Sequence, residues 1–243
     1  MRSRYPSSST LAYSFGPGPW TPAIKAIIIA NIVVFIATSL IRALEVPLWL
    51  NPQDVLHGQL WRLVTYMFVH AGVFHILFNM LTLWMFGVEL ERMWGTRYFL
   101  KFYFITGIAA ALTTILVSLI PMPMFEQLYN SRTVGASGAV VAVLLAYAMY
   151  FPNRPILMYF IFPIPAKYFV AIMGAISLMS GGNVAHATHI GGALAGYIYL
   201  KGGRIHLLSE IKYRYLKWRI NRMRRKFDVY SGGRADDVNR RVH

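Results

Sequence analysis

The feature that most constrains this chain is a series of long apolar stretches without a charged residue. They cover residues 26–41, 63–88, 102–125, 133–153 and 168–200. About 20 apolar residues in a helix cross a hydrocarbon core of roughly 30 Å. Soluble domains carry a charge at about a quarter of their positions, whereas this sequence does so at 14%. We therefore predict an all-α, polytopic membrane protein.

The apolar stretches predict six membrane helices, because the last stretch is too long for a single span. Ser180-Gly181-Gly182-Asn183 interrupts it, and we divide it there. The expected helices cover residues 24–42, 73–91, 99–119, 134–151, 164–180 and 184–200. The start of the fifth helix has two interpretations. The proline-containing run 155–164 either leads into the helix or lies along the membrane surface.

The positions of Lys and Arg predict the orientation of the bundle, since positive segments near span ends stay cytoplasmic. With the N-terminus inside, 21 of these residues lie on the inner side and only Arg42, Arg62 and Arg132 lie outside. We expect a cytoplasmic segment over residues 1–23, a membrane domain over 24–200 and a cytoplasmic tail over 201–243. Both termini are then cytoplasmic in a plasma membrane, and the lack of a long presequence favours a bacterial inner membrane.

The net charge of +15 is concentrated in the tail, where residues 201–243 hold 13 Lys or Arg and 4 Asp or Glu. Apolar residues recur there at helical spacing, which predicts a basic amphipathic helix. A cytoplasmic stop-transfer tail is the favoured interpretation, docking on anionic lipid headgroups is the alternative, and we expect no nucleic-acid binding. At the inner end of the second helix, Glu89 and Glu91 are expected to form ion pairs with Arg92 and Arg97.

Three polar clusters interrupt the apolar helices, and polar groups inside a bilayer usually mark a site or a helix contact. His75 and Asn79 share one face of the second helix, because they are four residues apart. Ser137 stands near the start of the fourth helix, and His189 near the start of the sixth. At 1.5 Å per residue, Asn79, Ser137 and His189 lie roughly 9, 5 and 8 Å inside spans of the same direction. We therefore predict that they meet at one level in the outer leaflet.

These residue types indicate nucleophilic catalysis by a serine. A serine hydroxyl attacks well only when a base removes its proton, and His189 is suited to that role. The tetrahedral intermediate needs hydrogen-bond donors for its negative oxygen, which Asn79, His75 and the backbone N–H of Ser137 can supply. The spans near His189 contain no Asp or Glu, and the chain contains no Cys. We therefore predict a Ser-His dyad without a carboxylate.

Small residues and further histidines surround this predicted site. Gly135 and Gly138 are expected to leave room for a substrate strand beside the serine. Gly192 and Gly196 form a small-xxx-small pattern, which predicts that the sixth helix closely approaches a neighbour. Two more histidines have two open interpretations, because each can support the site or cap a helix end. These residues are His70 and His186.

Three sequence motifs resemble those of the rhomboid intramembrane serine proteases. They are HILFN at 75–79, GASG at 135–138 and AHATHIGGALAG at 185–196, and Trp61-Arg62 resembles the loop motif of that family. The similarity covers about residues 24–200 and implies a six-helix rhomboid-like bundle. It implies that Ser137 is the nucleophile, that His189 is the general base and that the oxyanion site uses the side chains of His75 and Asn79. The backbone amides of Ser137 and Ala136 complete that oxyanion site by the same resemblance.

The resemblance also implies how such a protein works. We expect a water-accessible cavity at the outer face, lateral access for a substrate helix, and cleavage of transmembrane proteins near the outer membrane face. We expect no cofactor and no metal, and the expected partners are transmembrane substrates and membrane lipids. The natural substrate and the oligomeric state stay open.

Three other functions are weaker interpretations of the same residues. A metalloprotease would need a motif such as HExxH, which is absent from the sequence. A transporter or channel would need charges in mid-membrane or paired broken helices. A catalytically inactive relative that escorts membrane proteins should lack Ser137 or His189, and this chain has both.

Overall fold

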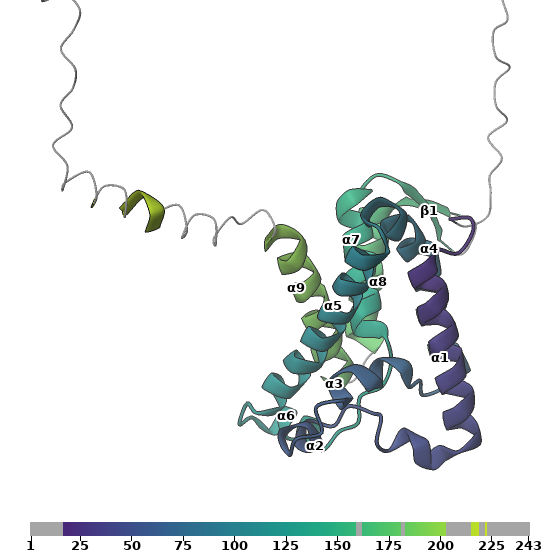
Figure 1. Ribbon diagram of the computed structural model, residues 1–243. Helices are drawn as coiled ribbons and strands as arrows, with labels where there is room; N and C mark the ends of the chain where they lie inside the picture. Colours follow the sequence, from purple (N-terminus) through teal and green to yellow (C-terminus); the bar gives the residue numbers. More distant parts are fainter. Residues whose placement is uncertain (1–16, 159–161, 181–182, 203–214, 219–221, 223–243) are drawn as a thin grey trace, which may run out of the picture. The chain divides into compact units, whose positions relative to one another are not determined.

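The computed structural model describes residues 17–158, 162–180, 183–202, 215–218 and 222, and these are mainly helical (Figure 1). Each of the six predicted helices is present, with ends within three residues of the expected positions. The predicted all-α fold class is therefore confirmed. The six helices are α1 (Pro22–Leu40), α4 (Val73–Trp94), α5 (Thr96–Ser118), α7 (Ser137–Tyr150), α8 (Ala166–Ser180) and α9 (Asn183–Gly202).

The six helices differ in length. Among the described residues, α1, α4 and α5 are long and apolar enough to cross a membrane, with 19, 22 and 23 residues. The apolar helix α7 has only 14 residues, and the apolar part of α8 covers Ala166–Ile176. A 14-residue helix is about 21 Å long, which is less than the roughly 30 Å of a hydrocarbon core.

The short helix α7 lies at the centre of the bundle. It packs against α4, α5 and α8, and most of its residues are buried. Its side chains are small, because alanine, glycine and valine dominate the sequence SGAVVAVLLAYAMY. Small side chains let neighbouring helices approach closely. Because its neighbours bury most of α7, this helix need not be long enough to span the hydrocarbon core by itself.

The buried carboxylate of Glu91 caps the first turn of α1. Its Oε1 accepts a hydrogen bond from the backbone N–H of Ala23 at 2.9 Å, and its Oε2 accepts one from Ile24 at 3.0 Å. The hydroxyls of Thr21 and Thr96 also donate to it. The first backbone N–H groups of a helix have no partner within the helix, so this carboxylate supplies partners that α1 itself lacks.

The prediction of ion pairs at this end of α4 is wrong, because the acidic residues have partners other than the expected arginines. Glu89 pairs with Arg154, which follows α7. Arg92 donates to the backbone carbonyls of Pro17 and Pro19 instead. Sequence proximity favoured pairs within one helix end, but the packing of α4 against other segments brings different groups together.

A β-hairpin occupies the proline-containing run before α8. Strands β1 (Pro155–Met158) and β2 (Phe162–Pro165) pair antiparallel, with Pro155 opposite Pro165 and Ile156 opposite Ile164. This corrects the expectation that the fifth helix begins at residue 164, since α8 begins at Ala166. Proline lacks the N–H that a helix interior needs, whereas a two-stranded ribbon tolerates it at edge positions.

The loop between α1 and α4 contains four short helical elements. They are η1 (Arg42–Glu45), α2 (Pro52–Leu56), α3 (Arg62–Thr65) and η2 (Tyr66–Phe68). A fifth short helix, α6 (Pro123–Tyr129), lies between α5 and α7. The loop reaches the segment before α7 through backbone hydrogen bonds between Leu50 and Thr133 in both directions, at 2.9 and 2.8 Å.

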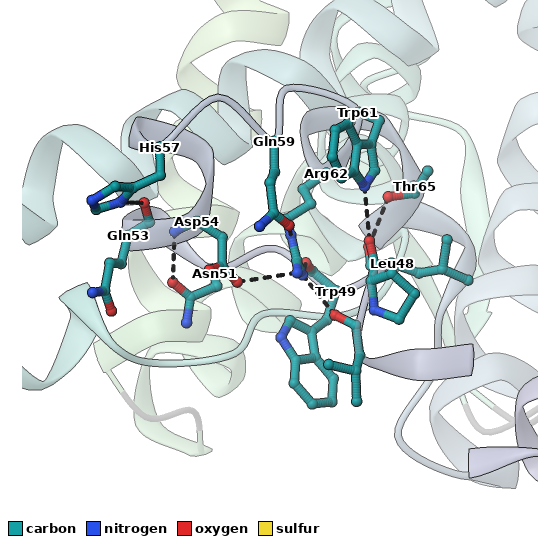
Figure 2. Close-up of polar contacts among 12 residues, drawn as sticks. Leu48, Trp49, Asn51, Gln53, Asp54, His57, Gln59, Trp61, Arg62 and Thr65 are labelled. Carbon is teal, nitrogen blue, oxygen red and sulfur yellow. Dashed lines mark hydrogen bonds and ion pairs between the residues drawn. The ribbon is translucent and has the colours of Figure 1, made fainter. Parts of the chain in front are cut away.

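Arg62 holds this loop together (Figure 2). Its side chain is buried, and Nη1 donates to the carbonyls of Val46 and Trp49 at 2.7 and 2.6 Å. Nε donates to Gln59 at 2.7 Å, and Nη2 forms an ion pair with Asp54 at 3.1 Å. Because one guanidinium serves four groups spread along the loop, Arg62 fixes its path.

The chain divides into two units, Met1–Leu200 and Lys201–His243. Within the second unit, residues 215–218 and 222 are helical. The predicted amphipathic helix of the tail lies mostly outside the described residues.

Candidate active site

Ser137 is the first residue of α7, and it directly follows a turn at Gly135. Gly135 has a backbone φ of +112°, a conformation that favours glycine. Its N–H donates to the carbonyl of Tyr66 at 2.9 Å, which ties the turn to the loop between α1 and α4. The expected helix start at residue 134 is wrong, because residues 133–136 form the bridge to Leu50 and this turn.

Ser137 and His189 are in contact, as the depth argument predicted. His189 lies on α9, and its Nε2 is 2.8 Å from Oγ of Ser137. That separation is a hydrogen bond between oxygen and nitrogen. The two side chains come from helices 52 residues apart in the chain, so packing of α9 against α7 creates the pair.

Glycines on α9 allow that packing. A Cβ placed on Gly192 would lie 2.1 Å from the carbonyl oxygen of Gly138 on α7. A Cβ on Gly196 would lie 3.0 Å from Cβ of Ala142, also on α7. The close approach expected from the small-xxx-small pattern is therefore present. A buried 2.8 Å hydrogen bond between the hydroxyls of Thr188 and Thr114 fastens α9 to α5 beside the site.

His75 and Asn79 reach the site from α4. Nδ1 of His75 accepts a hydrogen bond from the backbone N–H of Ala71 at 3.4 Å, which leaves its hydrogen on Nε2. The amide Nδ2 of Asn79 donates to the carbonyl of His75 at 2.9 Å. One further amide hydrogen of Asn79 remains for another acceptor.

The predicted role of Gly135 and Gly138 changes in the structure. A Cβ on Gly135 would lie 2.7 Å from Cε1 and Nε2 of His75. A Cβ on Gly138 would lie 2.7 Å from Cβ of Ala110 and 3.2 Å from Thr188. Protein side chains, rather than a substrate strand, therefore use the space that these glycines leave. Both glycines serve the close packing of groups around Ser137.

His70 and His186 occupy different surroundings. The ring of His70 contacts that of His75 edge-on, with centroids 5.0 Å apart. His70 is 2% exposed, and burial, followed by the charge of His75, lowers its pKa to about 4. His186 lies in the first half of α9, and its Nε2 has no hydrogen-bond partner among the described residues.

A cavity of about 540 Å³ opens beside the Ser-His pair. Ser137, His189, His75 and Asn79 all line it. The remaining walls are mostly apolar and come from α4, α7, α8 and α9. They are Phe74, Phe78, Thr82, Val140, Val141, Leu144, Leu145, Val170, Met173, Gly174, Ile190 and Ala193. A few polar groups in a large apolar cavity are typical of a binding site.

The described residues contain no cluster of three or more His, Cys, Asp or Glu side chains suited to a metal. The sequence between Glu126 and Glu210 contains neither Asp nor Glu. A carboxylate that orients His189 from α7, α8 or α9 is therefore excluded by composition.

Two residues that position the site were not predicted from the sequence. Tyr66 accepts from Gly135 with its carbonyl, and its hydroxyl donates to the carbonyl of Gly107 on α5 at 2.7 Å. Thr114 bonds Thr188 from α5. Neither Tyr66 nor Thr114 stands in a distinctive motif. Only the position of Thr188 next to His189 in the sequence could have indicated the Thr114–Thr188 pair.

Residues 57–203 match the family model of the Rhomboid domain, which is more than half of the chain. The chain is 32% identical over 139 residues to Rhomboid protein 1, mitochondrial, of Saccharomyces cerevisiae, covering 54% of this chain and 38% of that protein. It is 33% identical over 149 residues to Rhomboid protease GluP of Bacillus subtilis, with coverage of 59% and 26%. It is 34% identical over 146 residues to Rhomboid protease GlpG of Salmonella paratyphi A, with coverage of 59% and 47%.

The chain thus spans less than half the length of these curated relatives. The domain match nevertheless extends from the loop between α1 and α4 through α9 and includes Ser137 and His189. Together with the long apolar helices, it identifies a multi-pass membrane protein. This chain belongs to the rhomboid family.

Proposed function

We propose that this chain is an intramembrane serine endopeptidase that cleaves transmembrane helices of membrane proteins near the outer membrane face. One observation carries the proposal: Ser137 and His189 are 2.8 Å apart on the wall of a cavity of about 540 Å³. The names of two relatives, the rhomboid proteases GluP and GlpG, support the reaction class.

The Ser-His pair has the geometry for acyl transfer. In the proposed mechanism, Oγ of Ser137 attacks the scissile carbonyl carbon while Nε2 of His189 takes the hydroxyl proton. The protonated imidazole then gives this proton to the leaving amine, and the acyl group stays on the serine. His189 next removes a proton from water, which attacks the acyl-enzyme and releases the serine.

The oxyanion of each tetrahedral intermediate is proposed to lie between the start of α7 and α4. The backbone N–H of Ser137 belongs to the first turn of α7, where N–H groups lack partners within the helix. Nε2–H of His75 and the second amide hydrogen of Asn79 can add to it, and the amide of Ala136 completes the proposed set. One such donor contributes about 3 kcal/mol to the stability of the transition state.

Substrate access is proposed to occur between α4 and α8. Phe74 and Phe78 of α4 and Met173 of α8 line the cavity, and all three are exposed. Two to three turns further along α4, the ring of Phe86 packs against Phe169 of α8 with centroids 5.8 Å apart. These helices thus touch at one end and leave the cavity open at the other, which suits a substrate helix arriving from the lipid.

The proposed setting is a bacterial inner membrane, with both termini cytoplasmic and the Ser-His pair in the outer leaflet. The charge asymmetry supports this orientation, because 21 of 24 Lys and Arg residues then lie inside. The expected partners are transmembrane substrates and lipids.

An inactive relative that only binds membrane proteins is the competing function. A binder has no need for an activated hydroxyl, so covalent labelling separates the two. Ser137 should react with a fluorophosphonate probe, and His189→Ala should abolish that labelling while the protein stays folded.

Cleavage of a transmembrane substrate in liposomes tests the proposal directly. Ser137→Ala and His189→Ala should each lower the rate at least about 1,000-fold, since both groups act in the same step. Ser131→Ala and His57→Ala are matched controls on residues away from the cavity, and they should cleave like the parent protein. Equal rates for all five proteins would refute the mechanism.

A further inference from the structure

Two arginines of the predicted outer face converge on a second, smaller cavity. It measures about 100 Å³, and Arg42 and Arg132 both line it. The third outer arginine, Arg62, is buried and occupied by the loop contacts described above. The small cavity shares no lining residue with the cavity at Ser137. Both remaining outer basic residues therefore face one site that the proposed catalysis does not use.

The charge of this cavity is positive. Glu45 is the one acidic residue in its lining, and it pairs with Arg42 at 3.4 Å on the surface. Arg132 lies over the ring of Trp49, with its guanidinium carbon 5.5 Å from the ring centroid. Stacking on an aromatic face holds the guanidinium in place without neutralising it. Among the described residues no acidic group pairs with Arg132, so one positive charge remains at the cavity.

A buried histidine in the wall has one ring nitrogen without a hydrogen-bond partner among the described residues. His70 lines the cavity and is 2% exposed, yet its Nε2 has no hydrogen-bond partner among the described residues. Leaving a buried polar atom without a hydrogen-bond partner destabilises the folded protein. Nδ1 of His70 lies 3.4 Å from the carbonyl oxygen of Phe68, to which it donates. A ligand oxygen would therefore accept a hydrogen bond from Nε2–H of the imidazolium form, which a nearby negative phosphate favours.

We propose that this cavity binds a phosphate group through Arg42, Arg132 and His70. Guanidinium groups match the oxygens of a phosphate, which they bind through charge-assisted hydrogen bonds. Water occupies roughly 30 Å³ per molecule in the liquid, so the cavity can hold about three waters or one tetrahedral oxyanion instead. Its place after α1, at the end opposite Glu91, corresponds to the outer headgroup region. A phospholipid headgroup or a free phosphate compound can supply this chemistry.

A phosphate bound in the small cavity would affect the catalytic cavity through two contacts. The ring of His70 touches that of His75, and the N–H of Ala71, another lining residue, donates to Nδ1 of His75. A phosphate that fixes His70 would therefore also fix the tautomer and orientation of His75. In this step, which rests on the proposed function, His70 is a positioning residue.

The binding experiment uses the full chain carrying Ser137→Ala in a phosphate-free, non-ionic detergent. Its ligands are inorganic phosphate, glycerophosphoglycerol and phosphatidylglycerol, with a phosphate-free glycolipid as the reference. Binding is followed by the ring ¹⁵N signals of His70, assigned with His70→Gln, and by native mass spectrometry for the lipids. Because Ser137 is replaced, the result does not depend on peptidase activity.

We expect saturable binding that shifts the His70 signal, and a Kd at least about tenfold higher in Arg132→Gln and in Arg42→Gln. The matched control is Arg97→Gln, which removes one exposed positive charge from the start of α5 at the other end of the bundle; its Kd should stay within twofold. Binding of all three phosphate ligands would assign the site to the phosphate itself. Binding of phosphatidylglycerol alone would assign it to lipid.

Two results would overturn the proposal. One is equal affinity of Arg132→Gln, Arg42→Gln and Arg97→Gln for every phosphate ligand. The other is a site that binds an acidic peptide but none of the phosphate ligands. The positioning role has a separate readout in an active protein: loss of phosphate from the cavity should lower kcat more than it raises KM, and Arg132→Gln should remove that dependence.

Discussion

The substitution Gly192→Ala tests whether the contact between α9 and α7 sets the geometry of the Ser-His pair. The new Cβ would lie 2.1 Å from the carbonyl oxygen of Gly138 and 2.7 Å from its carbonyl carbon. Both are backbone atoms of a central helix, so no side-chain rotation can relieve the overlap. The helices must therefore move apart.

The required movement follows from these distances. A carbon to oxygen contact is ordinarily about 3.3 Å or longer, so α9 must withdraw from α7 by roughly 1 Å. Gly138 is next to Ser137, and Gly192 lies one turn after His189. The 2.8 Å hydrogen bond should then lengthen to about 3.8 Å, beyond hydrogen-bonding range. A displacement of about 1 Å in a catalytic group lowers the rate roughly 100-fold.

The assay is the initial rate of cleavage of a transmembrane substrate in liposomes, together with fluorophosphonate labelling of Ser137. Gly202→Ala is the matched control, because it lies on the same helix and its Cβ would meet nothing within 4 Å. Overpacking also destabilises a core by about 1–3 kcal/mol, so thermal melting must confirm that Gly192→Ala is folded at the assay temperature. A folded Gly192→Ala that cleaves within threefold of the parent would refute the reasoning, as would an equal loss in Gly202→Ala.

Two further predictions concern the loop between α1 and α4. Arg62→Ala removes the donor to the carbonyls of Val46 and Trp49, so the free energy of unfolding should fall by about 3 kcal/mol. Chemical unfolding in mixed micelles measures this change. A loss below about 1 kcal/mol would contradict the inferred role of Arg62. Burial lowers the pKa of His70 to about 4, so the unfolded chain binds a proton near pH 6.5 that the folded protein excludes, and stability should fall as the pH drops from about 6.5 towards 4. Melting temperatures of parent and His70→Gln between pH 7.5 and 4.5 should converge at low pH, whereas parallel curves would exclude this contribution.

The helices could be predicted from the sequence because long apolar runs have few alternatives in a membrane. The contact between Ser137 and His189 was also accessible, since helical rise places both at a similar depth. Ser137 and His189 meet although α7 begins three residues later than expected. Depth alone, however, does not give a distance between side chains.

The connecting segments were less predictable, since their structure depends on contacts between distant parts of the chain. A short apolar run with prolines, such as 155–164, carries no periodicity that separates a hairpin from a helix start. The partners of Glu91 lie on α1 and at the start of α5, whereas sequence reasoning considered nearby arginines. Likewise, the convergence of Arg42 and Arg132 depends on the path of the loop between α1 and α4, which no local pattern encodes.

The carboxylate of Glu91 also constrains how the bundle is made. It follows the residues that it caps by 67 to 70 positions, so a nascent α1 leaves the ribosome before its cap exists. Until α4 is inserted, the first N–H groups of α1 must remain in the hydrated headgroup layer, where water serves them. The final seating of α1 therefore waits for the insertion of α4.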